Sequence, residues 1–115
     1  MTRVRFDTEA DEELFEATGS LELRSAGLGK RLLEVVDETL GRLHEHPNLY
    51  ARVTDVEDAA DLDIRQVRLR PYRLLLIYTV LYENLSEVED EIRVIAIAHS
   101  SRLRGYWSNR IRRIK

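Results

Sequence analysis

The sequence predicts an α+β domain in which a helical hairpin packs on one face of a mostly antiparallel sheet. Apolar residues recur at helical spacing between residues 8 and 46, and strand-like runs follow Asp63. The last two runs are joined by a connection too short for a parallel crossover, so those strands must be antiparallel. A chain of 115 residues can bury one core but is too small for two. We therefore treat residues 1–115 as a single domain.

The N-terminal half is predicted to hold a short strand and two helices. Arg3 to Phe6 alternate basic and apolar residues, which is typical of an edge strand. A helix is expected to begin near Thr8, because Asp7 or Thr8 can cap it and acidic residues follow. Its apolar face contains Ala10, Leu14, Ala17 and Leu21.

The glycine-containing segment from Ser25 to Gly29 predicts the turn of the hairpin. A second helical run then continues until Pro47, where the missing amide proton forbids continuation, so this helix should end around Glu45 or His46. The run consists of Leu28, Leu32, Val35, Val36, Leu40 and Leu43.

The second half is predicted to be mainly strands. Residues 48–63 are acidic and irregular, and should form a mobile loop or contain a short edge strand near Tyr50 to Val53. The segment 64–70 alternates apolar and basic residues and ends at a turn around Pro71. Residues 73–82 form an almost continuous apolar run, expected to be a central strand covered on both faces. A polar connection over 83–91 leads to the last strand, 92–98, and a basic C-terminal segment follows.

Composition excludes several kinds of site. There is no cysteine, so disulfides, thiolate zinc sites and thiol nucleophiles are excluded, and a reducing cytoplasm fits best. His44 and His46 are two residues apart on a helix and point to different faces, so they make a poor metal pair. No phosphate-binding glycine loop is present. We expect neither a cofactor nor a metal, no exported leader and no membrane span.

The net charge of −3 conceals an asymmetry along the chain. Residues 1–64 contain 16 acidic and 7 basic side chains, net −9 with histidine neutral. Residues 65–115 contain 11 basic and 5 acidic side chains, net +6. Any surface that faces a polyanion must therefore come from the second half.

The end of the last strand is the most informative place for chemistry. His99 stands where that strand ends, and six basic residues with no acid follow from Arg102 onward. If the basic strand 64–70 is close by, guanidinium groups, an imidazole and a tyrosine could converge on one rim of the sheet. Such a set suits metal-free RNA cleavage, with arginine stabilising the phosphorane and histidine or tyrosine moving protons. The candidate catalytic residues are His99, Arg65, Arg102 and Tyr106.

Each of these residues also has a purely structural interpretation. Arginines that alternate on a strand usually form a solvated face, and a histidine at a strand end is more often hydrogen-bonded in the fold than catalytic. Trp107 is expected to dock the C-terminal segment into the core, the alternative being that it stacks on an unpaired base. Residues expected to bind a target without catalysis are Arg68, Arg70, Arg73, Trp107 and Arg110.

Four segments in order resemble the RelE/ParE family of toxins. They are FDTEADEEL, LGKRLLEVVDETLGRLHEHP, IRQVRLRPYRLLLIY and IRVIAIAHSSRLRGYW. In this resemblance Arg65 matches the arginine that begins the second strand, His99 and Arg102 match the family ending, and Tyr106 matches its aromatic residue. Thr8 and Arg104 depart from the family, standing where proline is frequent, and the acidic insertion near Asp55 to Asp63 is longer than usual.

The resemblance implies a microbial-ribonuclease-like fold and the toxin half of a bacterial type II toxin–antitoxin pair, neutralised by a cognate antitoxin. ParE-like members bind DNA gyrase and catalyse nothing, whereas RelE-like members cut ribosome-bound mRNA. The acidic pI of 5.6 and the presence of only two lysines favour the gyrase-type or an unassigned target. A ribosome-dependent endoribonuclease is the alternative, and a degenerate non-toxic binding module is a third. The antitoxin is expected to contact the hairpin at Leu14, Leu32 and Val36.

Overall fold

The computed structural model describes residues 3–60, 62–82 and 90–113. The strands are β1 (Arg3–Phe6), β2 (Ile64–Arg68), β3 (Leu74–Tyr82) and β4 (Asp90–His99). The α-helices are α1 (Thr8–Arg24) and α2 (Leu28–Glu45), and the short 3-10 helices are η1 (Glu57–Ala59) and η2 (Ser108–Arg113). The start of α1 at Thr8 and the end of α2 at Glu45 confirm the predicted helix boundaries.

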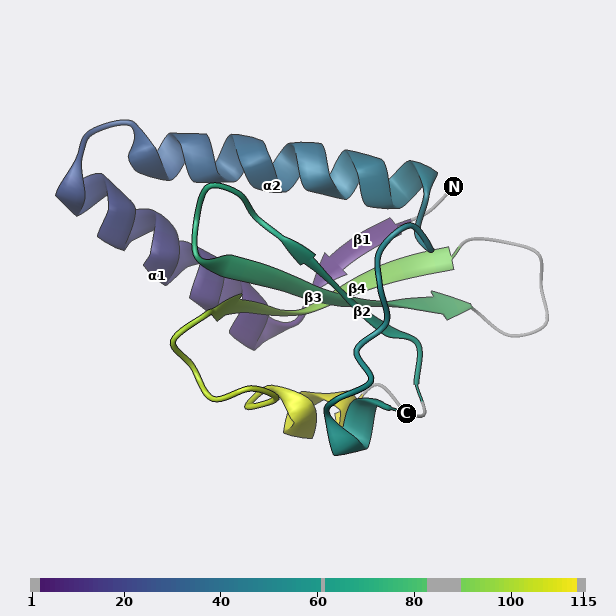
Figure 1. Cartoon of the computed structure of the whole chain (residues 1–115). Coiled ribbons are helices and arrows are strands. Elements are labelled where there is room, and N and C mark those ends of the chain that lie inside the picture. The colour runs from purple at the N-terminus through teal and green to yellow at the C-terminus, as the bar shows by residue number, and fades with distance from the viewer. Residues whose placement is uncertain (1–2, 61, 83–89, 114–115) are drawn as a thin grey trace.

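The four strands form one sheet in the order β1-β4-β3-β2 (Figure 1). β1 is parallel to β4, whereas β3 is antiparallel to both of its neighbours. The predicted edge position of β1 and central position of β3 are therefore confirmed. β2 is shorter than predicted and ends at Arg68, and the edge strand predicted near Tyr50 is reduced to one bridge between Arg52 and Arg65. Most of the polar connection predicted for 83–91 lies outside the described residues.

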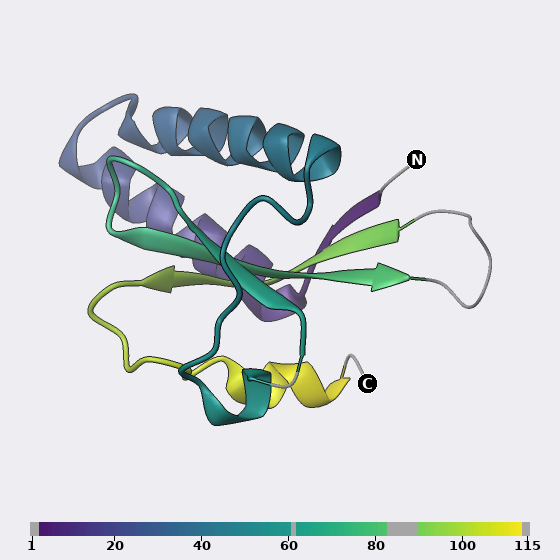
Figure 2. The same cartoon turned by 45° about the vertical axis from the view of Figure 1, so that its right-hand side comes forward.

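Each face of the sheet carries its own core. The helical hairpin covers one face, and the segment around η1 packs with η2 on the other (Figure 2). Leu32 and Leu76 lie in the core under the hairpin, while Ile77 and Trp107 lie in the core on the opposite face. A bulge at Ile95, where the register shifts between Ile77 and Tyr78, reverses the alternation of β4.

The turn between the helices depends on its two glycines. Gly27 has φ +92°, a left-handed conformation that a side chain disfavours. A Cβ on Gly29 would lie 2.6 Å from the carbonyl oxygen of Thr18, so only glycine lets the helices approach this closely. The Glu22 carboxylate accepts hydrogen bonds from the amides of both glycines, which lowers its pKa and satisfies the start of α2.

Candidate functional site

The β2–β3 turn and the end of β4 lie at the same end of the sheet (Figure 1). His99 pairs with Leu74 at the start of β3, and the Ser100 amide donates to the Arg73 carbonyl at 2.9 Å. Arg68 ends β2, Arg70 and Arg73 belong to the turn, and Arg102 follows β4 by a few residues. We call these four exposed arginines, Arg68, Arg70, Arg73 and Arg102, the basic rim.

The side chains of Arg68, Arg70 and Arg73 have no carboxylate partner in the described part of the chain. Hollows of about 540 Å³ and 390 Å³ lie beside them, and both are lined in part by Arg68 and Arg70. These three arginines are therefore exposed together at one end of the sheet, and their binding to a target stays a prediction.

Arg102 is held differently from the other rim arginines. Its guanidinium carbon lies 4.0 Å from the centroid of the Tyr106 ring, a cation–π contact. The guanidinium carbon of Arg110 lies 5.3 Å from the centroid of the same ring. The Tyr106 hydroxyl donates a short hydrogen bond to the Glu13 carboxylate. Burial and Glu13 together raise the pKa of Tyr106 well above its usual range, so the phenol stays protonated.

His99 is exposed at the rim. Its Nδ1 accepts a hydrogen bond from the Ser101 amide at 3.1 Å, and lies 2.7 Å from the Ser101 hydroxyl. In a neutral imidazole this arrangement leaves the proton on Nε2. His99 can therefore present a donor at Nε2 while Nδ1 is engaged.

Arg65 lies apart from His99. It pairs with Tyr78 on β3, four residues beyond the Leu74 that pairs with His99, which is about 13 Å along a strand. Its Nη1 donates to the Tyr50 carbonyl at 2.6 Å and to the Asn48 carbonyl at 3.2 Å, and its Nε lies 2.9 Å from Asp63. The structure thus does not bring Arg65 into the predicted convergence; it fixes the connection after α2 instead.

Two more predicted residues are used inside the fold. Trp107 is 1% exposed and packs in the core under the C-terminal segment, so the core interpretation is correct and its ring is not available for stacking. The Arg110 guanidinium donates to Glu13 at 2.7 Å and to the Ile95 carbonyl at 3.0 Å. Neither residue is free to bind a target in this conformation.

The Glu13 carboxylate is a feature that the sequence prediction missed. It accepts from Arg110, from Tyr106 and from the Ile97 amide, which lies on the part of β4 beyond the pairing with β1. Glu13 and Arg110 are separated by 97 positions in sequence, so no local pattern could have revealed the pair.

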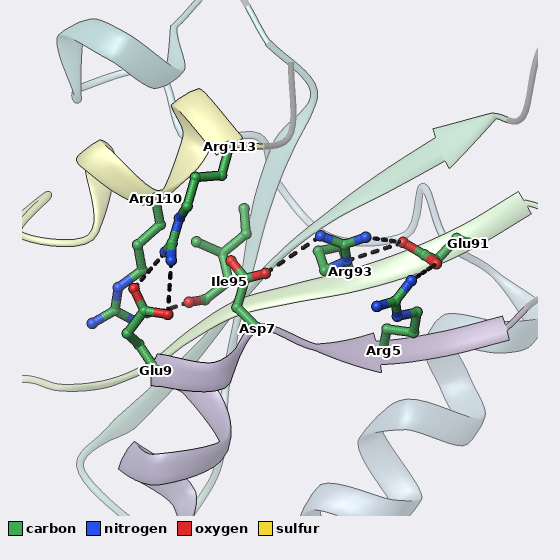
Figure 3. Close-up of polar contacts among 8 residues, drawn as sticks. All are labelled: Arg5, Asp7, Glu9, Glu91, Arg93, Ile95, Arg110 and Arg113. Atoms are coloured by element: carbon green, nitrogen blue, oxygen red, sulfur yellow. Dashed lines mark hydrogen bonds and ion pairs between the residues drawn. The ribbon is translucent and has the colours of Figure 1, made fainter.

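Further ion pairs continue from this carboxylate along β1. Arg93 bonds Glu91 at 2.7 Å and Asp7 at 3.4 Å, Arg5 lies 3.6 Å from Glu91, and Arg113 pairs with Glu9 (Figure 3). Arg113 lowers the pKa of Glu9. We call this set the paired region; its arginines are Arg5, Arg93, Arg110 and Arg113, and its acids are Asp7, Glu9, Glu13 and Glu91.

The residues expected to contact an antitoxin are divided by burial. Leu32 is fully buried and Val36 is 3% exposed, both facing the sheet, so a partner could reach them only if the hairpin opened. Leu14 is half-buried and lines a hollow of about 420 Å³ with Phe15 and Leu33 on the outer side of the hairpin. Within the described ranges, neither helix has the length and apolarity needed to cross a bilayer.

Comparisons with known proteins identify the family. Residues 4–104 match the family described as the ParE toxin of the type II toxin–antitoxin system parDE. The chain belongs to this family, so it is a toxin component whose family implies an antitoxin partner. A solved structure titled as the chromosomal ParDE TA system from P. aeruginosa is similar in fold, with a TM-score of 0.64 and 14% identity over 86% of this chain and 96% of that one. A comparison with curated proteins gave no match.

Proposed function

We propose that the chain inhibits DNA gyrase by binding it through the basic rim, without catalysis. The observation that supports this proposal is the contrast between free and engaged side chains. Arg68, Arg70 and Arg73 have no described carboxylate partner, whereas Tyr106 and Arg65 are engaged in the fold. A metal-free nuclease would need side chains such as Tyr106 and Arg65 free to transfer a proton and to bind the phosphate. A binding surface needs only the exposed arginines.

The test uses the purified chain in a DNA supercoiling assay with bacterial gyrase. We expect inhibition by the natural chain and at least about tenfold weaker inhibition by the double variant Arg68→Glu with Arg73→Glu. The matched control is Arg31→Glu with Arg112→Glu, two exposed arginines that line neither of the two rim hollows and give the same change in charge. Supercoiling that is unaffected by the natural chain would refute the proposal.

The ribonuclease alternative rests on His99, whose Nε2 is available at the rim. Pulse-labelling after expression of the chain alone in a bacterium separates the two mechanisms. Gyrase inhibition predicts an early fall in DNA synthesis, whereas mRNA cleavage predicts an early fall in protein synthesis that His99→Ala abolishes. Either target is found in the cytoplasm, where we propose that the protein acts.

We also propose that the antitoxin covers the outer side of the hairpin at Leu14. Phe15 is 81% exposed and Leu33 is 44% exposed beside it, and contiguous exposed apolar side chains of this kind commonly mark protein contacts. Phe15→Glu should weaken antitoxin binding and leave toxicity unchanged. Equal binding of this variant and the natural chain in a titration would contradict the assignment.

A further inference from the structure

The hollows around the basic rim have a one-sided charge. Two of these hollows, of about 540 Å³ and 390 Å³, share Arg68, Arg70 and Leu75, and neither is lined by an aspartate or a glutamate. The hollow of about 420 Å³ on the hairpin is lined by Asp11, Glu12 and Glu16. Hollows of similar size thus differ in charge. The two hollows at the rim are positively charged and would be complemented by negative groups of a binding partner.

A guanidinium can bind both oxygens of a carboxylate or of a phosphate at once. Elsewhere the chain makes this pairing itself: Arg104 bonds both carboxylate oxygens of Asp55, at 2.9 Å and 3.0 Å. Arg68, Arg70 and Arg73 have no such carboxylate among the described residues. The missing anions can be supplied by a partner.

The edge of β2 is open where the rim begins. The Ile64 carbonyl and the Gln66 amide bond outward to Val53 and Ala51. Alternation in an antiparallel ladder points the amide and carbonyl of Arg68 outward as well, and no backbone partner for them is found within the described ranges. An extended polypeptide can bond to such an open edge as it passes.

We infer that the basic rim holds an extended, acidic segment of a protein partner, with carboxylates on the arginines and apolar side chains against Pro71 and Leu75. This inference rests on the proposed function for the rim as the target site, and it specifies the chemistry of the segment bound there. The lining of the larger hollow includes Pro71, Leu74 and Leu75, which a phosphate backbone would leave unused.

Nucleic acid fits this surface less well because the described aromatic rings near the rim are all partly or fully buried, namely Tyr50, Tyr72, Tyr106 and Trp107. Trp107 is buried, the Tyr106 ring is covered by Arg102, and the Tyr72 hydroxyl bonds the Leu28 carbonyl at 3.3 Å. Unpaired bases are held mainly by stacking on such rings. The 16 acids of residues 1–64 also oppose a long polyanion.

The experiment is an NMR titration of the whole chain with a peptide of about ten residues that alternates glutamate and valine, the form taken by an added strand. We expect amide shifts confined to the rim and to Ser100, and binding at least about tenfold weaker in the double variant Arg68→Glu with Arg73→Glu. The control variant Arg31→Glu with Arg112→Glu should bind as the natural chain does. A peptide alternating glutamine and valine should bind at least about tenfold more weakly than the acidic one.

Two outcomes would overturn the inference: acidic-peptide binding that the rim variant does not weaken, or a single-stranded DNA oligonucleotide that binds the rim while the acidic peptide does not. The supercoiling assay on the same preparations keeps the two proposals distinct. Gyrase inhibition without peptide binding would refute only the acidic segment. Peptide binding without inhibition would refute only gyrase as the target.

Discussion

The paired region and the basic rim are both rich in arginine, but they use it in opposite ways. Along β1, β4 and η2, each arginine of the paired region meets a carboxylate from Asp7, Glu9, Glu13 or Glu91. At the β2–β3 turn, Arg68, Arg70 and Arg73 meet none among the described residues. The difference lies in where the acidic first half of the chain is placed. Asp7, Glu9 and Glu13 lie just before α1 or in its N-terminal part, where they pair with arginines of β4 and η2. The opposite end of the sheet receives no such carboxylate among the described residues and stays positive.

The largest effect should follow removal of the central acid of the paired region. Glu13→Ala leaves the guanidinium of Arg110, which is 9% exposed, and the amide of Ile97 without their carboxylate. Breaking a buried pair by removing one partner costs about 3 kcal/mol of unfolding free energy. Urea unfolding at neutral pH measures this loss. A second variant, Glu13→Gln with Arg110→Met, removes the uncompensated charge and should be more stable than Glu13→Ala. If it is not, the loss in Glu13→Ala does not come from the unpaired charge of Arg110.

A smaller loss is expected where the two regions meet. Arg102→Ala removes the cation–π contact with Tyr106, which stabilises the folded chain by about 0.5–1 kcal/mol. Thermal unfolding is measured for the natural chain, for Arg102→Ala, which loses the cation, and for Arg102→Lys, which keeps the positive charge. Identical melting of all three chains would show that the stacking does not stabilise the C-terminal segment.

A still smaller effect should be visible as a dependence on pH. Arg113 lowers the pKa of Glu9 below its ordinary 4.5 in the folded chain. A carboxyl whose pKa is lower in the folded chain than in the unfolded chain stabilises the fold at any pH above its unfolded pKa. That contribution is lost as the pH falls through the folded pKa. The stability gap between the natural chain and Arg113→Ala should therefore be present at neutral pH and lost in acid, once the pH has fallen below 4.5 and through the folded pKa of Glu9. A gap of equal size at both pH values would contradict the pairing.

The smallest effect on stability is expected at the β2–β3 turn, where the rim arginines make no described ion pair. Arg70→Gln breaks no described ion pair, so the unfolding free energy should change by less than about 0.5 kcal/mol. The same measurement on Arg93→Gln, in the paired region, should give a clearly larger loss because Glu91 is 5% exposed and loses its closest cation. Equal losses in the two variants would remove the distinction between the regions.

Local patterns in the sequence were sufficient to predict the four strands, the helical hairpin and its packing on one face of the sheet, but not η1 and η2 on the other face. The periodicity of residues 8–46 predicted the hairpin, and the short connection after β3 predicted the antiparallel pair. The basic character of Arg68, Arg70 and Arg73 was also predictable, because no acid interrupts that stretch. The sequence could not predict which arginines form hydrogen bonds and ion pairs within the fold, because Arg65 and Arg68 occur in the same strand pattern. Only the fold places the Tyr50 carbonyl and Asp63 beside Arg65.

The bonds that Glu13 and Arg110 make to β4 have a further consequence for solubility. β4 spans Asp90–His99, but β1 pairs only with Glu91 to Val94, so the strand continues past the end of its neighbour. An uncovered strand edge is a template for joining further chains and for aggregation. Glu13 binds the Ile97 amide and Arg110 binds the Ile95 carbonyl, so two side chains take the place of the absent strand. Through these two bonds, an ion pair that stabilises one molecule also prevents its sheet from extending into the next.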